Sequence, residues 1–275
     1  MLEGGGIKMS FRENVEQIPV IKHKFSYVLM IILFLLLLKT PFLYWTGLKE
    51  QGIMFSHCAF LLFSVTIGLR EFRPYYNKST GIWRIMTMAM TIFLCSFIAE
   101  NLVSALLQAN DPQQLEQYTF HVSWRYMLNH FGRYSLVGIG EEIFKWMFFL
   151  ILYAFTFKAC KRSMIAFIIS TVTTSLMFGY LHINYNLDQA LNITLIIAIS
   201  AVVYFYFLIK YQTIIPLMIA HGLQDFLVSL ELTSELEGIY ILSVYTMFIL
   251  VVGIPMVGSF YRGIKTLVLR FRYKE

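Results

Sequence analysis

The chain is built mostly from long apolar runs separated by short polar segments. A helix that crosses a bilayer needs about 20 consecutive, mostly apolar residues. Stretches of roughly that length occur at residues 25–47, 53–69, 82–107, 134–157, 163–183, 190–209, 213–230 and 239–261. The pattern therefore predicts an all-α fold, a polytopic membrane bundle of about eight transmembrane helices.

The segments outside these runs divide the chain into few parts. We expect residues 1–24 to form an N-terminal tail, residues 25–262 the transmembrane domain, and residues 263–275 a basic C-terminal tail. Between the third and fourth spans, the stretch 111–133 is polar and aromatic. Such a composition favours an interfacial helix and loop. The sequence shows no soluble domain and no internal repeat.

Composition agrees with a membrane domain. Hydrophobic residues make up 58% of the chain and charged residues 14%, whereas soluble domains carry about 25% charged residues. The formal net charge of +6 would suit a nucleic-acid partner, but in a membrane protein it reflects basic cytoplasmic loops. We therefore expect a protein embedded in the lipid bilayer, with no nucleic-acid partner.

The positions of Lys and Arg predict the orientation of the bundle. With eight spans, four basic loop residues fall on one side, namely Lys39, Lys49, Arg125 and Arg133. Seventeen fall on the other side: Lys8, Arg12, Lys22, Lys24, Arg70, Arg73, Lys78, Arg84, Lys158, Lys161, Arg162, Lys210, Arg262, Lys265, Arg270, Arg272 and Lys274. Because cytoplasmic loops carry the basic excess, both termini are predicted to be cytoplasmic.

Charged residues inside the fourth span point to a function. Glu141, Glu142 and Lys145 lie within the apolar run 134–157. A charged side chain at the centre of a bilayer costs at least about 2.5–3.5 kcal/mol on insertion scales. On a helix, Glu141 and Lys145 are one turn apart on the same face. The lysine is therefore a natural counter-ion for one of the two carboxylates.

Two later spans carry further polar groups. Phe178 and His182 lie four residues apart near the end of the fifth span, and His221 and Asp225 lie four apart in the seventh. In the predicted orientation, these residues and the glutamate pair all fall in the outer half of the bilayer. We therefore expect them to share one site. Glu100, in the third span, is either a helix–helix contact or a further catalytic group.

Two histidines and a carboxylate on neighbouring helices permit two mechanisms. A divalent metal ion, for which we expect zinc, would take Glu142, His182 and His221 as ligands and keep one position for water. Without a metal, a carboxylate and one histidine would deprotonate water, and the other histidine would donate to the developing oxyanion. In both mechanisms Asp225 would fix the tautomer of His221. The residues leave both open.

The order and spacing of these motifs resemble the CPBP (Abi) superfamily of intramembrane proteases. That group includes the type II CAAX prenyl endopeptidases and, more distantly, the PrsW proteases. The resemblance covers about residues 134–230, and Phe178-x-x-x-His182 follows the CPBP pattern. One position departs from it: Trp146 stands where CPBP proteins usually have an arginine.

The first and third motifs are closer to the PrsW pattern. The spacing Glu141-Glu142-x-x-Lys145 resembles the first PrsW motif, and His221-x-x-x-Asp225 resembles the third. The resemblance implies a membrane-embedded hydrolase. It does not imply a prenylated CAAX substrate, because the usual arginine is absent.

The resemblance also implies roles for individual residues. Glu141 and Glu142 would activate water, and His182 and His221 would bind a metal or stabilise the transition state. Asp225 would support His221. Lys145 and Phe178 would be supporting residues of the same site.

Three function hypotheses follow. The first is an intramembrane endopeptidase of a bacterial plasma membrane that cuts a membrane-associated peptide or protein. The second is a non-catalytic scaffold or regulator that retains the protease fold, including one for bacteriocin self-immunity. The third is a small transporter that uses Glu and His as a proton relay, although many transporters contain an internal repeat.

Overall fold

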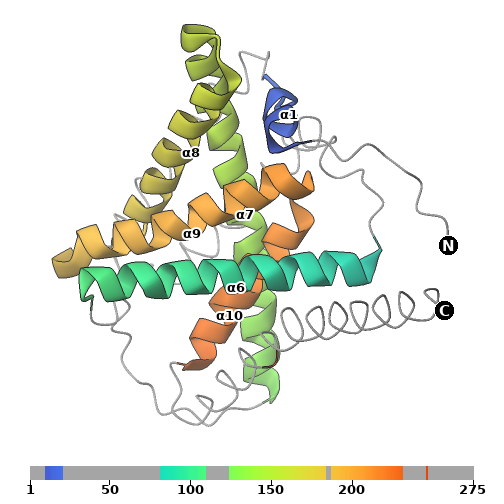
Figure 1. Ribbon diagram of the computed structural model, residues 1–275. Helices are drawn as coiled ribbons and strands as arrows, with labels where there is room; N and C mark the ends of the chain where they lie inside the picture. The colour runs from blue at the N-terminus through green and yellow to red at the C-terminus, as the bar shows by residue number, and fades with distance from the viewer. Residues whose placement is uncertain (1–9, 21–80, 110–123, 184–186, 232–245, 247–275) are drawn as a thin grey trace, which may run out of the picture.

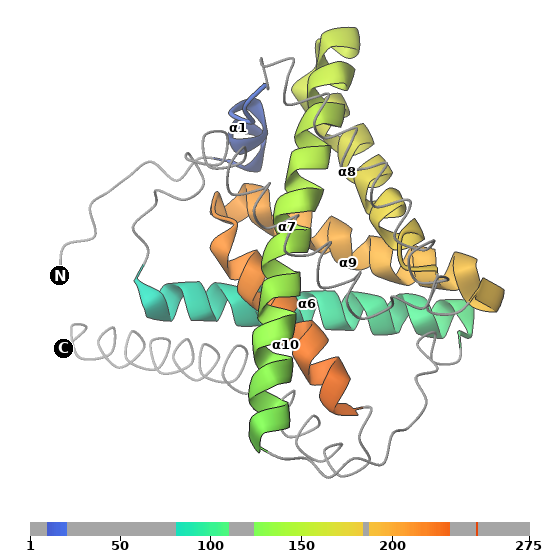
Figure 2. The ribbon, with the colours of Figure 1, turned by 180° about the vertical axis from the view of Figure 1, so that it is seen from behind.

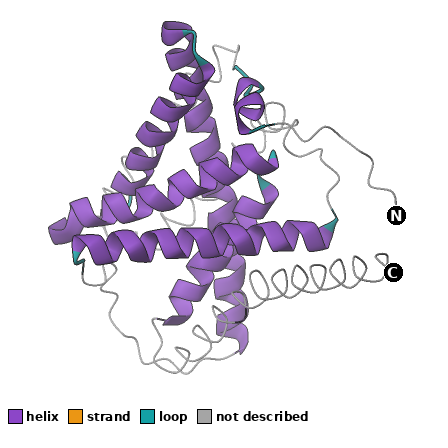
Figure 3. Cartoon of the chain, in the orientation of Figure 1, coloured by secondary structure: helices purple, strands orange, loops and turns teal. Residues whose placement is uncertain are grey.

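The computed structural model describes residues 10–20, 81–109, 124–183, 187–231 and 246, and within these ranges all regular structure is helical. The helices are α1 (Phe11–Glu16), α6 (Ile82–Leu107), α7 (Trp124–Cys160), α8 (Ser163–Tyr180), the 3-10 helix η3 (Leu187–Gln189), α9 (Ala190–Tyr211) and α10 (Ile215–Glu231), as Figure 3 shows. The prediction of an all-α fold is confirmed for this part of the chain.

Among the described helices, four are long and apolar enough to cross a membrane. They are Ile82–Leu107, His130–Cys160, Ser163–Tyr180 and Ala190–Tyr211, and a shorter apolar helix covers Ile215–Val228. These five correspond to the third to seventh predicted spans. The predicted spans 25–47 and 53–69, and all of 239–261 except residue 246, lie outside the described residues. The total of eight spans and the cytoplasmic position of both termini therefore stay predictions.

The fourth predicted span begins earlier than its apolar pattern indicates. The sequence predicts a helix from residue 134 after an interfacial segment, whereas α7 runs without a break from Trp124 to Cys160. The residues that precede 134 are more polar, but polarity alone does not end a helix. The remainder of the predicted interfacial segment, residues 111–123, lies outside the described residues.

Local backbone geometry ends several helices. Gln108 after α6 and Gln212 after α9 adopt left-handed conformations, with φ of 50° and 51°, and this conformation is a common helix stop. Lys161, with φ of 57°, separates α7 from α8. Pro216 lies in the first turn of α10, where a missing backbone N–H costs nothing.

The long helix α7 organises the molecule. Figures 1 and 2 show α8 leaning against one end of α7 and α10 packed along its other half. α6 and α9 lie side by side and cross α7, and α9 also packs on α8. α10 additionally contacts α6, and side chains of α9 reach the middle of α7, where the ring centroids of Phe205 and Phe149 are 4.9 Å apart.

Stacked aromatic rings form the core on one side of this crossing. The ring of Phe149 in α7 is fully buried, and its centroid lies 5.1 Å from that of Trp146 and 5.8 Å from that of Tyr153. Phe205 of α9 and Phe167 of α8 approach it at 4.9 and 5.9 Å. Such pairs stabilise by both burial and ring geometry.

The short helix α1 closes the same end of the molecule. Phe11 stacks on Tyr206 of α9 at 5.4 Å between ring centroids. The buried Asn14 donates from Nδ2 to the carbonyl of Ile209 at 3.1 Å. The hydroxyl of Tyr153 in α7 donates to the carbonyl of Val15 at 3.4 Å. α1 is therefore tied to the aromatic core by side chains and by backbone carbonyls.

Candidate active site

The polar turn of α7 holds a buried ion pair. Glu142 and Lys145 form a salt bridge, and each residue is only 3% exposed. The Lys145 ammonium also lies 4.4 Å from the ring centroid of Phe178 in α8 and 4.6 Å from that of Tyr204 in α9. Aromatic faces stabilise a cation in this position. The sequence predicts that Lys145 is the counter-ion of either Glu141 or Glu142. In the structure its salt bridge is with Glu142, three residues earlier on the helix.

His221 of α10 connects this ion pair to two further carboxylates. Its Nδ1 lies 2.6 Å from Oε1 of Glu142. Its Nε2 lies 3.4 Å from Oε2 of Glu141 and 3.7 Å from Oδ2 of Asp225. Because an ionised carboxylate only accepts hydrogen bonds, the Nδ1–H of His221 donates to Glu142. Glu142 therefore orients the imidazole, and its second nitrogen faces Glu141 and Asp225.

His182 approaches the same glutamate from just beyond the end of α8. Its Nδ1 lies 2.7 Å from the carbonyl oxygen of Phe178 and donates to it, and its Nε2 lies 3.9 Å from Oε2 of Glu141. Because the proton on Nδ1 is donated to this carbonyl, the neutral form of the ring has its lone pair on Nε2.

Glycines let the helices around the site approach closely. A Cβ on Gly138 of α7 would collide with the backbone of Gly222 in α10. A Cβ on Gly179 of α8 would collide with the backbone of Thr194 in α9. The contact between Gly138 and Gly222 lies within one turn of the polar residues of both helices. It therefore brings the glutamates of α7 and the histidine of α10 within reach of each other.

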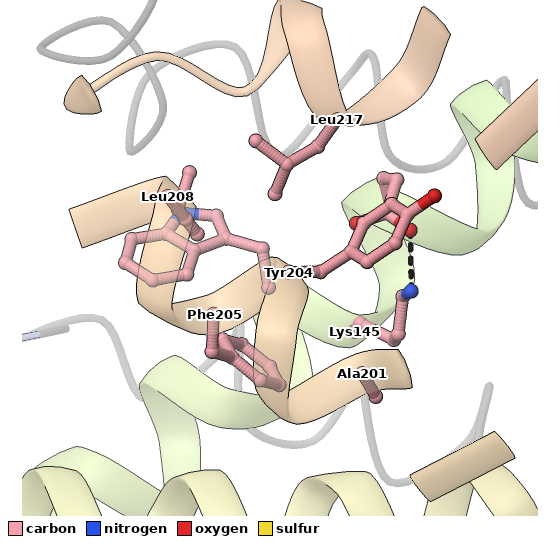
Figure 4. A pocket seen from close by; sticks show the side chains of 8 residues that line it. Lys145, Ala201, Tyr204, Phe205, Leu208 and Leu217 are labelled. Atoms are coloured by element: carbon pink, nitrogen blue, oxygen red, sulfur yellow. Dashed lines mark ion pairs between the residues drawn. The ribbon is translucent and has the colours of Figure 1, made fainter. Parts of the chain in front are cut away.

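A narrow space adjoins the ion pair, and Figure 4 shows it with Lys145 beside the ring of Tyr204. The space is too narrow for a water molecule. Its lining consists of Glu142, Lys145, Trp146, Ala201, Tyr204, Phe205, Leu208 and Leu217. The salt bridge is consequently held in dry surroundings, where charge interactions are stronger than in water.

The structure brings the predicted site residues of three helices into one region. They are Glu141, Glu142, Lys145, Phe178, His182, His221 and Asp225. Two neighbours of the site were not among the predicted site residues, Tyr204 and Gln224. Gln224 lies between the two residues of the third motif, and Tyr204 comes from α9, a helix without a motif. Neither side chain is charged, so the sequence gives no electrostatic signal that they lie beside the site.

Trp146 occupies a different environment from a charged residue. It is 1% exposed, and its ring stacks on that of Phe149 in the aromatic core. The positive charge that accompanies the glutamates is supplied one position earlier, by Lys145. Although Trp146 replaces the usual arginine, the glutamate pair therefore still has a neighbouring cation.

Comparison with known proteins bears on the same segment. Residues 123–227 match the family described as type II CAAX prenyl endopeptidase Rce1-like. No curated protein and no solved structure gave a match. The matched segment contains α7, α8 and α9 and all three motifs. The match supports the predicted resemblance of this segment to the CPBP superfamily, which includes the CAAX-type intramembrane proteases.

Proposed function

We propose that the protein is an intramembrane endopeptidase that hydrolyses a peptide bond with water activated by Glu141. The observation that supports this most directly is a convergence of three side chains. The Nε2 atoms of His182 and His221 both approach Oε2 of Glu141, at 3.9 and 3.4 Å. A carboxylate between two imidazoles on a membrane helix suits proton transfer to and from water.

A difference in exposure supports different roles for the two glutamates. The side chain of Glu142 is 3% exposed and is engaged by both Lys145 and His221. The side chain of Glu141 is 21% exposed, so a water molecule can reach it. In the proposed mechanism Glu141 takes a proton from water as the oxygen attacks the scissile carbonyl carbon. Glu141 then returns that proton to the departing amine.

His221 serves as the donor to the oxyanion. When the imidazole carries both ring protons, Nδ1–H donates to Glu142 and Nε2–H remains for the carbonyl oxygen as it gains negative charge. An ionised Asp225, at 3.7 Å from the same nitrogen, favours the protonated ring by its charge before the substrate arrives. The neutral His182 presents a lone pair instead, and it accepts a hydrogen bond from the attacking water.

The same atoms also suit a metal ion in their donor chemistry. Within the described residues, no group of three or more His, Cys, Asp or Glu side chains stands ready to hold one. The Nε2 atoms of His182 and His221 together with Glu141 nevertheless make up a His₂Glu donor set, and a carbonyl or carboxylate holds each Nδ1, as is usual for zinc ligands. A bound zinc ion would polarise water or the scissile carbonyl.

Metal content can be measured without reference to activity. Purified protein equilibrated with zinc and then desalted would be analysed by mass spectrometry for bound metal. About one zinc per chain, lost in His182→Ala/His221→Ala, would support the metal-assisted form. No zinc above the level of the double variant would favour the metal-free form with Glu141 as base.

The substrate we propose is a membrane-associated peptide or protein of a bacterial plasma membrane. The site lies on helices that are apolar enough to cross a bilayer, so a substrate must reach it within or close to the membrane. Lys145 is covered by Phe178 and Tyr204. It is therefore not available to bind a substrate carboxylate, and the proposal does not require a prenylated C-terminus.

Cleavage should be tested with purified protein in lipid vesicles and a library of quenched fluorescent peptides that carry a lipid anchor. We expect the wild type to cleave some members. Glu141→Gln and His221→Ala should each lower the rate by about 10²–10⁴-fold, the usual contribution of a proton-transfer group. Asn101→Ala is the matched control, since Asn101 is exposed on α6 and bonds its own helix.

Two outcomes would contradict the proposal. Wild-type rates in both Glu141→Gln and His221→Ala would exclude the mechanism. If a null strain regained its phenotype with a Glu141/Glu142/His182 triple alanine variant, the protein would act as a scaffold or regulator instead.

A further inference from the structure

A second polar network lies next to the candidate site, between α6, α9 and α10. Its centre is Gln224 of α10. The Nε2 of Gln224 lies 2.8 and 2.7 Å from the two carboxylate oxygens of Glu100 in α6. Its Oε1 accepts from the hydroxyl of Tyr204 at 3.2 Å and from that of Ser96 at 3.3 Å. Both ends of the amide are therefore bonded.

The partners leave only one orientation for this amide. The carboxylate of Glu100 accepts hydrogen bonds, so the NH₂ end of Gln224 must face it. The hydroxyl of Tyr204 then donates to the oxygen end. Ser96 also lies 2.5 Å from the hydroxyl of Ser200 in α9, which ties α6 to α9 at the same level. A fully satisfied network of this kind fixes the relative positions of its helices.

The network touches the site at two points. Gln224 follows His221 by three residues and precedes Asp225 by one, so it lies on a neighbouring face of the same two turns of α10. The ring of Tyr204, whose hydroxyl bonds Gln224, packs edge-on against His221 at 5.8 Å between centroids. The face of the same ring lies under the ammonium of Lys145. A change in the network would therefore reach both the histidine and the ion pair.

We propose that Glu100 and Gln224 are positioning residues of the peptidase site. They hold α10 at the rotation about its axis that directs His221 and Asp225 toward Glu141. This inference rests on the proposed function, because a positioning residue needs a reaction to serve. Glu100 and Gln224 touch neither the scissile bond nor the attacking water in this mechanism, and they act through His221.

The key experiment exchanges the two side chains. Gln224→Leu removes the amide, and Glu100→Gln removes the carboxylate. The double variant Glu100→Gln/Gln224→Glu restores a carboxylate–amide pair with the roles reversed. In it, the hydroxyls of Tyr204 and Ser96 still find an acceptor. Tyr204→Phe removes one donor and keeps the ring, and Asn101→Ala on α6 is the control.

The readout is the rate per folded molecule on the peptide that the wild type cleaves fastest. We expect Gln224→Leu to lower kcat by about 10–100-fold, as losses of residues that orient a ligand commonly do, with KM nearly unchanged. Tyr204→Phe should lower kcat less, and the exchanged pair should recover most of the loss. Unchanged kcat in Gln224→Leu and Tyr204→Phe, with lower thermal stability only, would show a structural role and overturn the proposal.

A second readout separates this inference from the proposed function. The ¹⁵N resonances of the His221 ring, recorded in detergent micelles on histidine-labelled protein, report its hydrogen bonds directly. Gln224→Leu and Tyr204→Phe should shift them, and Asn101→Ala should not. If no peptide is cleaved but these shifts appear, the function is wrong and the positioning stands. Shifts absent in both variants would overturn the positioning even if the wild type cleaves.

Discussion

Two neighbouring stretches of α7, which we call its polar half (residues 141–145) and its aromatic half (residues 146–153), are both largely buried but are stabilised in different ways. Around Glu142 and Lys145, the helix is held by charges that are paired with each other and with His221. From Trp146 to Tyr153, the same helix is held by stacked rings that are also in contact with α8 and α9.

The difference has a physical consequence for mutation. In the polar half, removing one member leaves a charge without its partner, so the loss exceeds what the contact itself contributed. In the aromatic half, removing one ring leaves a cavity, and the loss is close to the packing and burial of that ring. In the proposed mechanism the polar half carries out proton transfer, and the aromatic half supports it.

Glu142→Ala should have the largest effect of any single change in the polar half. It strands the ammonium of Lys145 and removes the acceptor of the His221 Nδ1–H. We expect a loss of about 3–5 kcal/mol in the free energy of unfolding, as for other broken buried pairs, and no measurable peptide cleavage. Chemical unfolding in detergent and the vesicle cleavage assay would measure the two effects.

A double variant tests the reason for that loss. Glu142→Ala/Lys145→Met removes the stranded cation while it keeps a long side chain beside Phe178 and Tyr204. It should regain much of the stability of the wild type without regaining activity. Equal instability of the single and double variants would show that an unpaired charge is not the cause.

The polar half was more accessible to prediction from sequence than the aromatic half. Charged residues inside an apolar run are conspicuous, and the predicted orientation of the spans was enough to predict that Glu141, His182 and His221 meet. The division of labour that we propose for Glu141 and Glu142 could not be predicted, because the two residues are adjacent and differ only in which neighbours surround them. Gln224 was missed because a neutral amide in a membrane helix gives no electrostatic signal.

The fold shows the same limit. Apolar runs located the cores of α6, α8 and α9 closely, because hydrophobic length is the main requirement of a spanning helix. The start of α7 at Trp124 was missed, since a helix can continue past the end of its apolar run. The stacking around Phe149 could not be predicted, because it depends on how three apolar helices pack and apolar residues give no clue to their partners.

Phe149→Ala should separate stability from activity. Phe149 is fully buried among four aromatic rings, so truncation should cost about 3–5 kcal/mol. The cleavage rate per folded molecule should stay close to that of the wild type. Phe155→Ala is the control on the same helix, since Phe155 is 61% exposed and its loss should change stability much less. A fall in the rate per folded molecule would mean that the two halves are coupled.

Gly138→Ala should disturb the polar half by geometry alone. The added methyl group meets the backbone of Gly222, so α7 and α10 must move apart, at a cost of about 1–3 kcal/mol. The cleavage rate should fall as well, because His221 moves away from Glu141. Gly132→Ala is the matched control, because a Cβ there meets nothing within 4 Å. Thermal unfolding and the cleavage rate of both variants would measure the contrast. Equal losses in the two variants would show that the contact between Gly138 and Gly222 is not the cause of the loss.

The smallest effect should come from Ser10→Ala, at the start of α1. Ser10 accepts a hydrogen bond from the backbone N–H of Glu13 at 3.3 Å, and the Glu13 carboxylate accepts one from the Ser10 N–H at 2.6 Å. Loss of such a cap costs about 0.5–2 kcal/mol. α1 docks on the aromatic half through Phe11, so the loss should appear in thermal stability while cleavage is unchanged. Arg12→Ala is the control, because it removes only an exposed ion pair with Glu16, and it should change neither thermal stability nor cleavage. A drop in cleavage after Ser10→Ala would show that α1 also affects the polar half.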